Sequence, residues 1–110
     1  MNDPWTTISA LAVRFDASDA GRGMAPEESH VLQVLKIGEE FGEAAQAVIG
    51  AKGTNPRKGT SHTWDDVHDE VADVAITALV ALARMRPDAP AYFADQLRLK
   101  AAKFLPGGTA

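Results

Sequence analysis

Hydrophobic and polar residues follow each other along most of the chain with the 3.6-residue period of an α-helix, and prolines and glycines divide this pattern into four stretches. Asp3-Pro4 offers an N-cap followed by a proline at the first helical position, and Pro26 starts the second stretch. Thr63 with Asp66 resembles a capping box at the start of the third, and Asp88 can cap the fourth. We therefore predict helices over residues 4–18, 26–51, 63–86 and 88–104, followed by a tail over 105–110.

No stretch shows the strict alternation of a β-strand, and residues 53–62, GTNPRKGTSH, have two glycines, a proline and no period, which indicates a loop. A chain of 110 residues forms one domain. The pattern predicts a single all-α domain with a four-helix, bundle-like architecture. Because so short a chain buries only a modest core, we expect it to self-associate.

Composition excludes several classes of function. The formal charge of −4 argues against a broad surface for a nucleic-acid polymer or an anionic membrane. There is no cysteine, so a disulfide, a thiolate metal site and a cysteine nucleophile are ruled out. The first residues lack the basic start and apolar run of a secretory signal, and no stretch is apolar for long enough to span a bilayer, so we expect a cytoplasmic protein.

The predicted helix over 26–51 has an apolar face and an acidic face. The apolar face, which we expect to point into the core, consists of Val34, Ile37, Phe41, Ala45 and Val48. Glu39, Glu40 and Glu43 fall on the opposite side. Such a cluster is typical of a solvated surface, and Lys36 can pair with Glu40 at the i,i+4 spacing. Taken alone, this helix favours a solvated face over a metal site.

The predicted helix over 63–86 changes that interpretation. From Val71 to Ala83 it is apolar on nearly every side, a pattern typical of a helix enclosed by other elements. Glu70 and Asp73 share one face, and Asp73 lies inside the apolar run VADVAI, where we expect it to be partly buried. A buried carboxylate needs a partner.

Two pairs of carboxylates, Glu40 with Glu43 and Glu70 with Asp73, are thus expected on neighbouring antiparallel helices. One like-charge contact at about 5 Å costs roughly 3 kcal/mol at an effective dielectric near 20, and a divalent cation between the pairs reverses the sign of this energy. Carboxylates without histidine or cysteine suit Mg²⁺ or Mn²⁺. Because Mg²⁺ in such a site usually completes its shell with waters and substrate phosphates, the implied reaction class is hydrolysis of a phosphoanhydride. The histidines, His30, His62 and His68, are interpreted as surface or capping residues.

At these residues the chain resembles the MazG-like all-α nucleotide pyrophosphohydrolases. The family pattern E-E-x-x-E stands here as Glu39-Glu40-Phe41-Gly42-Glu43, and E-x-x-D stands as Glu70-Val71-Ala72-Asp73. The resemblance covers roughly residues 26–86. It implies a homodimeric or homotetrameric enzyme that uses Mg²⁺ to hydrolyse a (deoxy)nucleoside triphosphate to the monophosphate and pyrophosphate.

The resemblance also implies roles for single residues. Glu40, Glu43, Glu70 and Asp73 would bind the metal, and Glu39 would help bind a second ion or orient the attacking water. Candidate contacts for the nucleotide substrate are Lys36, Arg57, Lys58, Trp64, Thr77, Lys100 and Lys103. For each of these residues an ordinary surface or core role remains open.

Two alternatives accompany this hypothesis. The second helix also resembles that of the phosphoribosyl-ATP pyrophosphohydrolases, but that group tends to follow the E-x-x-D aspartate with a Tyr-His pair, whereas VAITAL follows Asp73 here. The other alternative is a non-catalytic helical module whose acids bind a partner or a structural cation.

Overall fold

The computed structural model describes residues 3–107, and these residues form four helices and no strand. The helices are α1 (Pro4–Gly21), α2 (Pro26–Lys52), α3 (Trp64–Met85) and α4 (Ala89–Phe104). The all-α prediction is confirmed for this part of the chain, and the largest difference in boundaries is at the end of α1, which reaches Gly21 instead of residue 18. Of the predicted tail, residues 108–110 lie outside the described residues.

Side chains that cap the helices explain why α1 and α3 begin where the sequence predicts. The Asp3 carboxylate accepts a hydrogen bond from the Trp5 amide at 3.0 Å. Thr63 and Asp66 form the capping box: the Asp66 amide donates to Thr63 Oγ1 at 3.1 Å, and the Thr63 amide donates to the Asp66 carboxylate at 2.9 Å.

The cap predicted for α4 does not form. The Asp88 side chain makes no hydrogen bond to the first turn of α4, because its two carboxylate oxygens accept from the Arg86 guanidinium at 2.8 and 2.9 Å. Arg86 also stacks over the ring of Tyr92, with 3.9 Å between the guanidinium carbon and the ring centroid. This bidentate pair fixes the turn between α3 and α4 in place of a cap.

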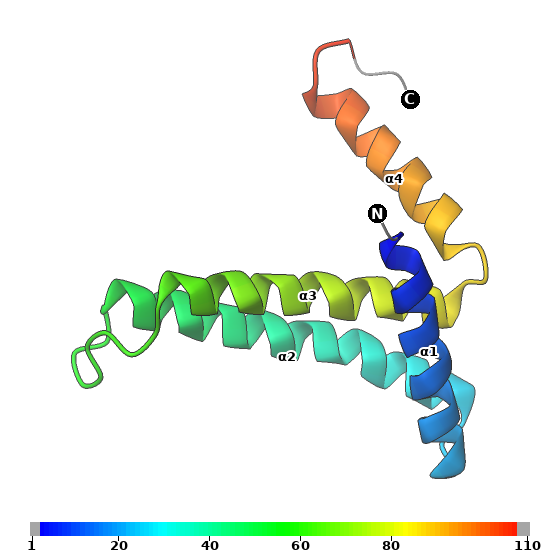
Figure 1. Cartoon of the computed structure of the whole chain (residues 1–110), viewed down its shortest axis with the longest axis horizontal. Coiled ribbons are helices and arrows are strands. Elements are labelled where there is room, and N and C mark those ends of the chain that lie inside the picture. Colours follow the sequence, from blue (N-terminus) through cyan, green and yellow to red (C-terminus); the bar gives the residue numbers. More distant parts are fainter. Residues whose placement is uncertain (1–2, 108–110) are drawn as a thin grey trace.

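The helices are arranged around one long hairpin. Helices α2 and α3 lie side by side and antiparallel, α1 crosses them near the end away from the loop, and α4 leaves that same end and projects away from the hairpin (Figure 1). The ring of Phe93 on α4 packs edge-on against Trp5 of α1, with 6.0 Å between centroids. The chain alone is therefore not the closed bundle that the sequence predicts. Its radius of gyration is 17.2 Å, against about 13 Å for a compact chain of this length.

The face of α2 that packs on α3 is not the predicted one. Its buried residues lie at spacings of three, four and eleven, which keep them on one side of the helix, and they are small or polar, namely Ser29, Gln33, Ala44, Ala47 and Gly50. We call this row the α2 seam. The predicted apolar face points outward, and Phe41 is 66% exposed. Small seam residues allow the two helices to approach closely, whereas Phe41 and its neighbours find no second layer within the chain.

Helix α3 is likewise covered on one side only. Its buried residues are Val67, Thr77, Val80, Ala81 and Arg84. Val71 is 56% exposed, and Asp73 is exposed as well, so the predictions of an enclosed α3 and a partly buried Asp73 are wrong for the single chain. The reason is the same as for α2, since α4 does not fold back over the hairpin.

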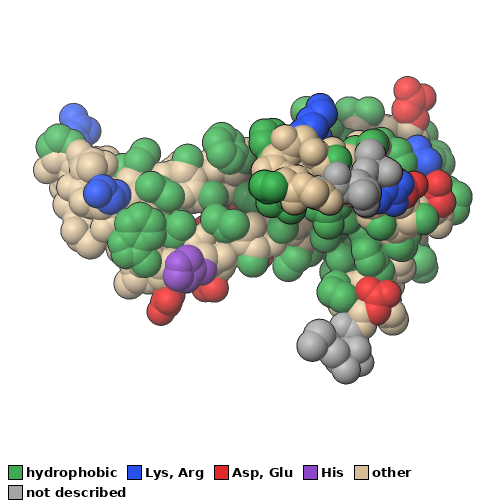
Figure 2. Space-filling view, turned by 90° about the horizontal axis from the view of Figure 1, so that it is seen from above, with side chains coloured by type: hydrophobic (Ala, Val, Ile, Leu, Met, Phe, Trp, Pro, Cys, Tyr) green, Lys and Arg blue, Asp and Glu red, His purple; other side chains and the backbone are tan. Residues whose placement is uncertain are grey.

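The chain exposes an unusual amount of surface. Its accessible area is 7866 Å², whereas a folded monomer of 11.7 kDa is expected to expose about 5,900 Å². Hydrophobic side chains are spread over the hairpin seen from above, and basic side chains lie both at its loop end and at the opposite end (Figure 2). Among the described residues, no helix is long and apolar enough to cross a bilayer.

Candidate metal centre

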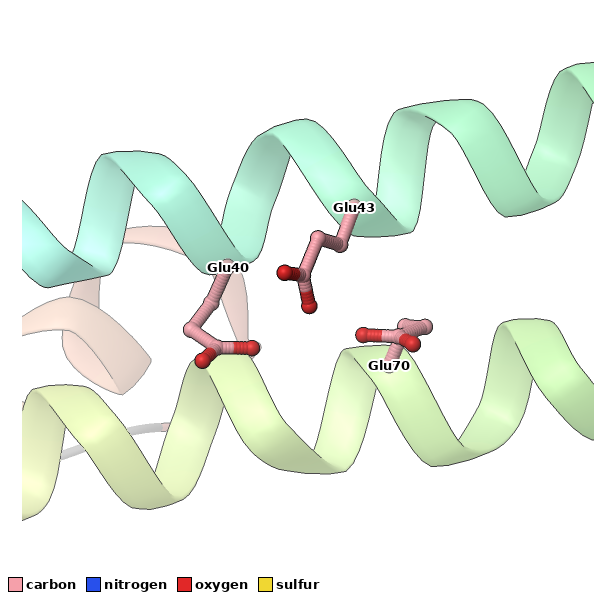
Figure 3. Close-up of side chains that lie close together, drawn as sticks. All are labelled: Glu40, Glu43 and Glu70. Atoms are coloured by element: carbon pink, nitrogen blue, oxygen red, sulfur yellow. The ribbon is translucent and has the colours of Figure 1, made fainter.

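Three of the predicted metal ligands meet between α2 and α3. Glu40 and Glu43 project from α2 toward Glu70 on α3 (Figure 3). One carboxylate oxygen from each residue lies within 4.8 Å of the other two. Glu40 and Glu43 continue the three-and-four spacing of the α2 seam, which is why an acidic pair that looked solvated in the sequence points at the partner helix. We call these residues the carboxylate cluster.

The cluster has an unpaired acceptor. Glu70 Oε2 is buried and has no hydrogen-bond partner among the described residues. The Glu40 side chain is only 13% exposed, and it forms an ion pair with Lys36, whose Nζ lies 3.6 Å from Glu40 Oε1. A buried anionic oxygen without a partner costs free energy, and a bound cation removes that cost. Three carboxylates with no nitrogen or sulfur ligand fit a hard divalent cation such as Mg²⁺ or Mn²⁺.

Two acids of the sequence motifs stay outside the cluster. Asp73 is exposed on α3, one turn beyond Glu70, and Glu39 is exposed on α2 beside Glu40. Along the helix axis, Asp73 is about 4.5 Å from Glu70 and Glu39 about 1.5 Å from Glu40.

Of the predicted substrate contacts, Lys36 and Lys58 line cavities on either side of the cluster. Thr77 is buried in the α2–α3 contact, and its carbonyl accepts a hydrogen bond from Gln33 Nε2 at 3.3 Å. The Thr77 side chain is therefore part of the helix packing.

The remaining candidates are further from the carboxylates. Trp64 begins α3 and is 51% exposed, and Arg57 lies in the α2–α3 loop, where its amide donates to Asn55. Lys100 and Lys103 are exposed on α4, which leaves the hairpin at the end opposite the loop.

The sequence analysis missed a buried polar network at the α1 end of the hairpin. Arg84, whose side chain is only 3% exposed, donates to Asp16 Oδ1 at 2.8 Å, to Gln33 Oε1 at 2.8 Å and to Asp19 Oδ2 at 2.7 Å. It also bonds the Ser29 hydroxyl. The network therefore joins α1, α2 and α3 through one guanidinium.

These contacts shift the pKa values of the charged groups. Hydrogen bonds from Ser29 and then Arg84 hold the pKa of the Asp19 carboxyl below its ordinary value. Burial alone would lower the pKa of Arg84, but its hydrogen bonds to Asp19 and Asp16 raise it instead. Both shifts favour the charged forms of Asp19 and Arg84 at neutral pH.

The network forms the polar wall of a cavity of 290 Å³. Its apolar lining comes from Phe15, Met24 and Leu32. Lys36 stands at the edge of this cavity and also contacts Glu40, so the cavity opens beside the carboxylate cluster. We call it the α1-side cavity.

One sequence signal could have found these residues. Thr77, Ala81 and Arg84 follow each other at spacings of four and three, so Arg84 lies on the face of α3 that is buried. A buried arginine needs acids nearby, and Asp16 and Asp19 on α1 supply them.

Comparisons with known proteins identify no relative. No protein-family model matches the chain, and neither the search of curated proteins nor that of solved structures gives a match. The geometry of the site and the two acidic motifs are therefore the features that bear on function.

Proposed function

We propose that this protein is a Mg²⁺-dependent nucleotide pyrophosphohydrolase that cleaves a (deoxy)nucleoside triphosphate to the monophosphate and pyrophosphate. One observation carries the proposal. Glu40, Glu43 and Glu70 converge from two helices, and the buried Glu70 Oε2 has no partner within the described residues. The E-E-x-x-E and E-x-x-D motifs supply these same residues, which favours phosphoanhydride chemistry over a purely structural ion.

The cluster residues would hold the cation, and Asp73 is proposed to join them from the next turn of α3. A divalent cation bound there balances the charge that develops on the phosphate oxygens during cleavage. We assign Glu39 as the base that accepts a proton from the attacking water, because its exposed carboxylate lies outside the cluster. The water oxygen bonds to the α-phosphorus. The bond between the α-phosphorus and the oxygen that bridges the α- and β-phosphates breaks, and pyrophosphate leaves with that oxygen.

The α1-side cavity is proposed to receive the nucleoside. Its apolar wall, with Phe15 and Leu32, suits the face of a base, and the polar wall offers hydrogen-bond partners for the sugar and base edges. Lys36 lies between this cavity and Glu40, where its ammonium can contact the first phosphate.

We further propose that a second copy of the chain covers the outward apolar face of the hairpin, in a homodimer or homotetramer. The chain exposes about 2,000 Å² more than a compact monomer of its mass, an excess comparable to the area that obligate dimers bury. Phe41, Val34 and Val71 belong to this exposed surface. A second copy would complete the bundle that one chain leaves open.

The test is release of pyrophosphate from a panel of ribo- and deoxynucleoside triphosphates, and from phosphoribosyl-ATP, with Mg²⁺ or Mn²⁺. We expect turnover of at least one substrate, and Glu70→Gln should reduce it by about 10²-fold or more while the helical content is unchanged. Glu28→Gln removes a charge from the first turn of α2, away from the cluster, and serves as the matched control. Cation binding without turnover of any substrate would instead favour a non-catalytic helical module.

A further inference from the structure

A second cavity lies at the loop end of the hairpin. Its volume is 210 Å³, and its polar lining residues are Gln46, Asn55, Lys58, Ser61 and His62. We call it the loop-end cavity. It has no part in the function proposed so far.

The loop that walls this cavity has a defined local structure. The Asn55 side chain accepts hydrogen bonds from the amides of Arg57 at 2.9 Å and Lys58 at 3.4 Å. The amide of Gly59 donates to the Asn55 carbonyl at 2.9 Å, and Gly59 has the left-handed φ of 58° that closes so tight a turn. This turn holds Lys58 at the cavity.

The floor of the cavity depends on Gly50, because a glycine has no side chain. A Cβ atom at Gly50 would overlap the His62 ring and the Ser61 hydroxyl. The Ser61 amide donates to the Gly50 carbonyl at 3.1 Å, and Ser61 Oγ lies 3.0 Å from His62 Nδ1. The loop therefore packs directly against the last turn of α2, and Ser61 and His62 are held there.

The lining chemistry is that of an oxyanion site. Lys58 supplies a positive charge, the lining includes no carboxylate, and hydroxyl, amide and imidazole groups surround the space. Of the acids next to the lining in sequence, Asp66 accepts a hydrogen bond from the Thr63 amide, Asp65 lies 3.8 Å from His68, and Glu43 belongs to the carboxylate cluster. The positive charge of this cavity contrasts with the formal charge of −4 of the whole protein.

Its position relates it to the carboxylate cluster. Gln46 and Gly50 follow Glu43 by three and seven residues, which corresponds to about 5 and 10 Å along the helix axis. The order along α2 is thus the α1-side cavity, Lys36, the carboxylate cluster and the loop-end cavity. A phosphate chain that starts at the cluster and runs away from the nucleoside would point toward the loop-end cavity, which Lys58 lines.

We propose that the loop-end cavity is a phosphate-binding subsite that holds the terminal phosphates of the substrate and the pyrophosphate product. This inference rests on the proposed function for the identity of the ligand. It adds a direction: the nucleoside lies toward α1, and the terminal phosphates lie toward the α2–α3 loop.

The experiment titrates the full chain with inorganic pyrophosphate in the presence of Mg²⁺, by calorimetry and by amide chemical shifts. We expect saturable binding with the largest shifts at Gly59, Ser61 and His62. Lys58→Gln should weaken the affinity about tenfold, as expected for loss of one charge-assisted contact. Lys52→Gln removes the same charge from the last turn of α2, outside the cavity lining, and should change the affinity less than twofold.

Three results would overturn the inference: no pyrophosphate binding, equal losses in the two lysine variants, or shifts confined to the α1-side cavity. Ser61→Ala gives a second variant that removes a donor without changing charge, and it should weaken binding less than Lys58→Gln. Other results distinguish the subsite from the proposed function. If pyrophosphate binding depends on Lys58 but no nucleotide is turned over, only the proposed enzymatic activity is contradicted. If a nucleotide is turned over and its KM is unaffected by Lys58→Gln, only the subsite is contradicted.

Discussion

The Lys36 ammonium lies 3.6 Å from the Glu40 carboxylate and also forms the edge of the α1-side cavity. One side chain therefore touches both the proposed cation site and the proposed nucleoside site, and its charge acts on them in opposite directions.

Lys36→Gln should tighten cation binding and weaken nucleotide binding. Without the lysine, one positive charge no longer repels the ion, and because Lys36 is half exposed we expect a gain of only about 3- to 10-fold. Loss of a phosphate contact should raise KM by about tenfold. Calorimetry with Mn²⁺ and steady-state kinetics measure the two effects, and a change of the same sign in both would contradict the assigned position.

Divalent cations should stabilise the fold through the carboxylate cluster. At a free concentration 100 times the dissociation constant, a cation that binds only the folded chain adds about 2.7 kcal/mol to the free energy of unfolding. Glu43→Gln should abolish this response and raise the melting temperature in a chelator, because it relieves repulsion among the three carboxylates. Thermal denaturation with Mg²⁺, with Mn²⁺ and with chelator tests this prediction, and Glu28→Gln should behave as the native chain.

Arg84→Met should destabilise the protein by about 2–4 kcal/mol, because it leaves Gln33 and Asp19 without their buried donor. Denaturant unfolding measures the change. Arg14→Met, on the exposed side of α1, is the control and should alter stability by less than about 0.5 kcal/mol. Equal effects of the two variants would show that the network is unimportant for folding.

The stabilising contribution of Asp19 should disappear in acid. Its pKa is lower in the folded chain than in the unfolded chain, so the contribution is complete above the unfolded pKa and is lost as the pH falls through the folded pKa. The difference in unfolding free energy between the native chain and Asp19→Asn should thus be constant near neutral pH and shrink below about pH 4. A difference that grows in acid would contradict this assignment.

Phe41→Glu should dissociate the proposed oligomer. Phe41 is 66% exposed in the single chain, and a charge in an apolar interface would be costly. Analytical ultracentrifugation should show a dimer or tetramer for the native chain and a smaller species for the variant. Ala17→Glu, at an exposed position of α1, should keep the native assembly. A native chain that is monomeric at every concentration would exclude the assembly.

Much of the secondary structure could be predicted because its signals are local. Pro4, Pro26 and the Thr63 capping box mark the starts of three helices within one residue. The packing could not be predicted in the same way. Hydrophobic periodicity assigned Phe41 to the core, but a chain with one hairpin and a projecting α4 has no second layer to cover it.

The candidate site shows the same division. The acidic motifs identified Glu40, Glu43 and Glu70, which the structure brings together. The role of Arg84 was missed, because it depends on contacts with Asp16 and Gln33, which are 68 and 51 residues away along the chain. Local patterns carry no information on such distant pairs.

The contacts at the two ends of the hairpin have a consequence for the cluster between them. The Gln33 side chain donates to the Thr77 carbonyl of α3 at one end, and the amide of Ser61, three residues before α3 begins, donates to the Gly50 carbonyl at the other, so both contacts favour the present register of α2 against α3. A slip of one turn would move Glu70 by about 5.4 Å, more than the 4.8 Å that now encloses the three oxygens. Cation affinity is therefore a measure of helix alignment, and substitutions that loosen either end should lower it without altering a single carboxylate.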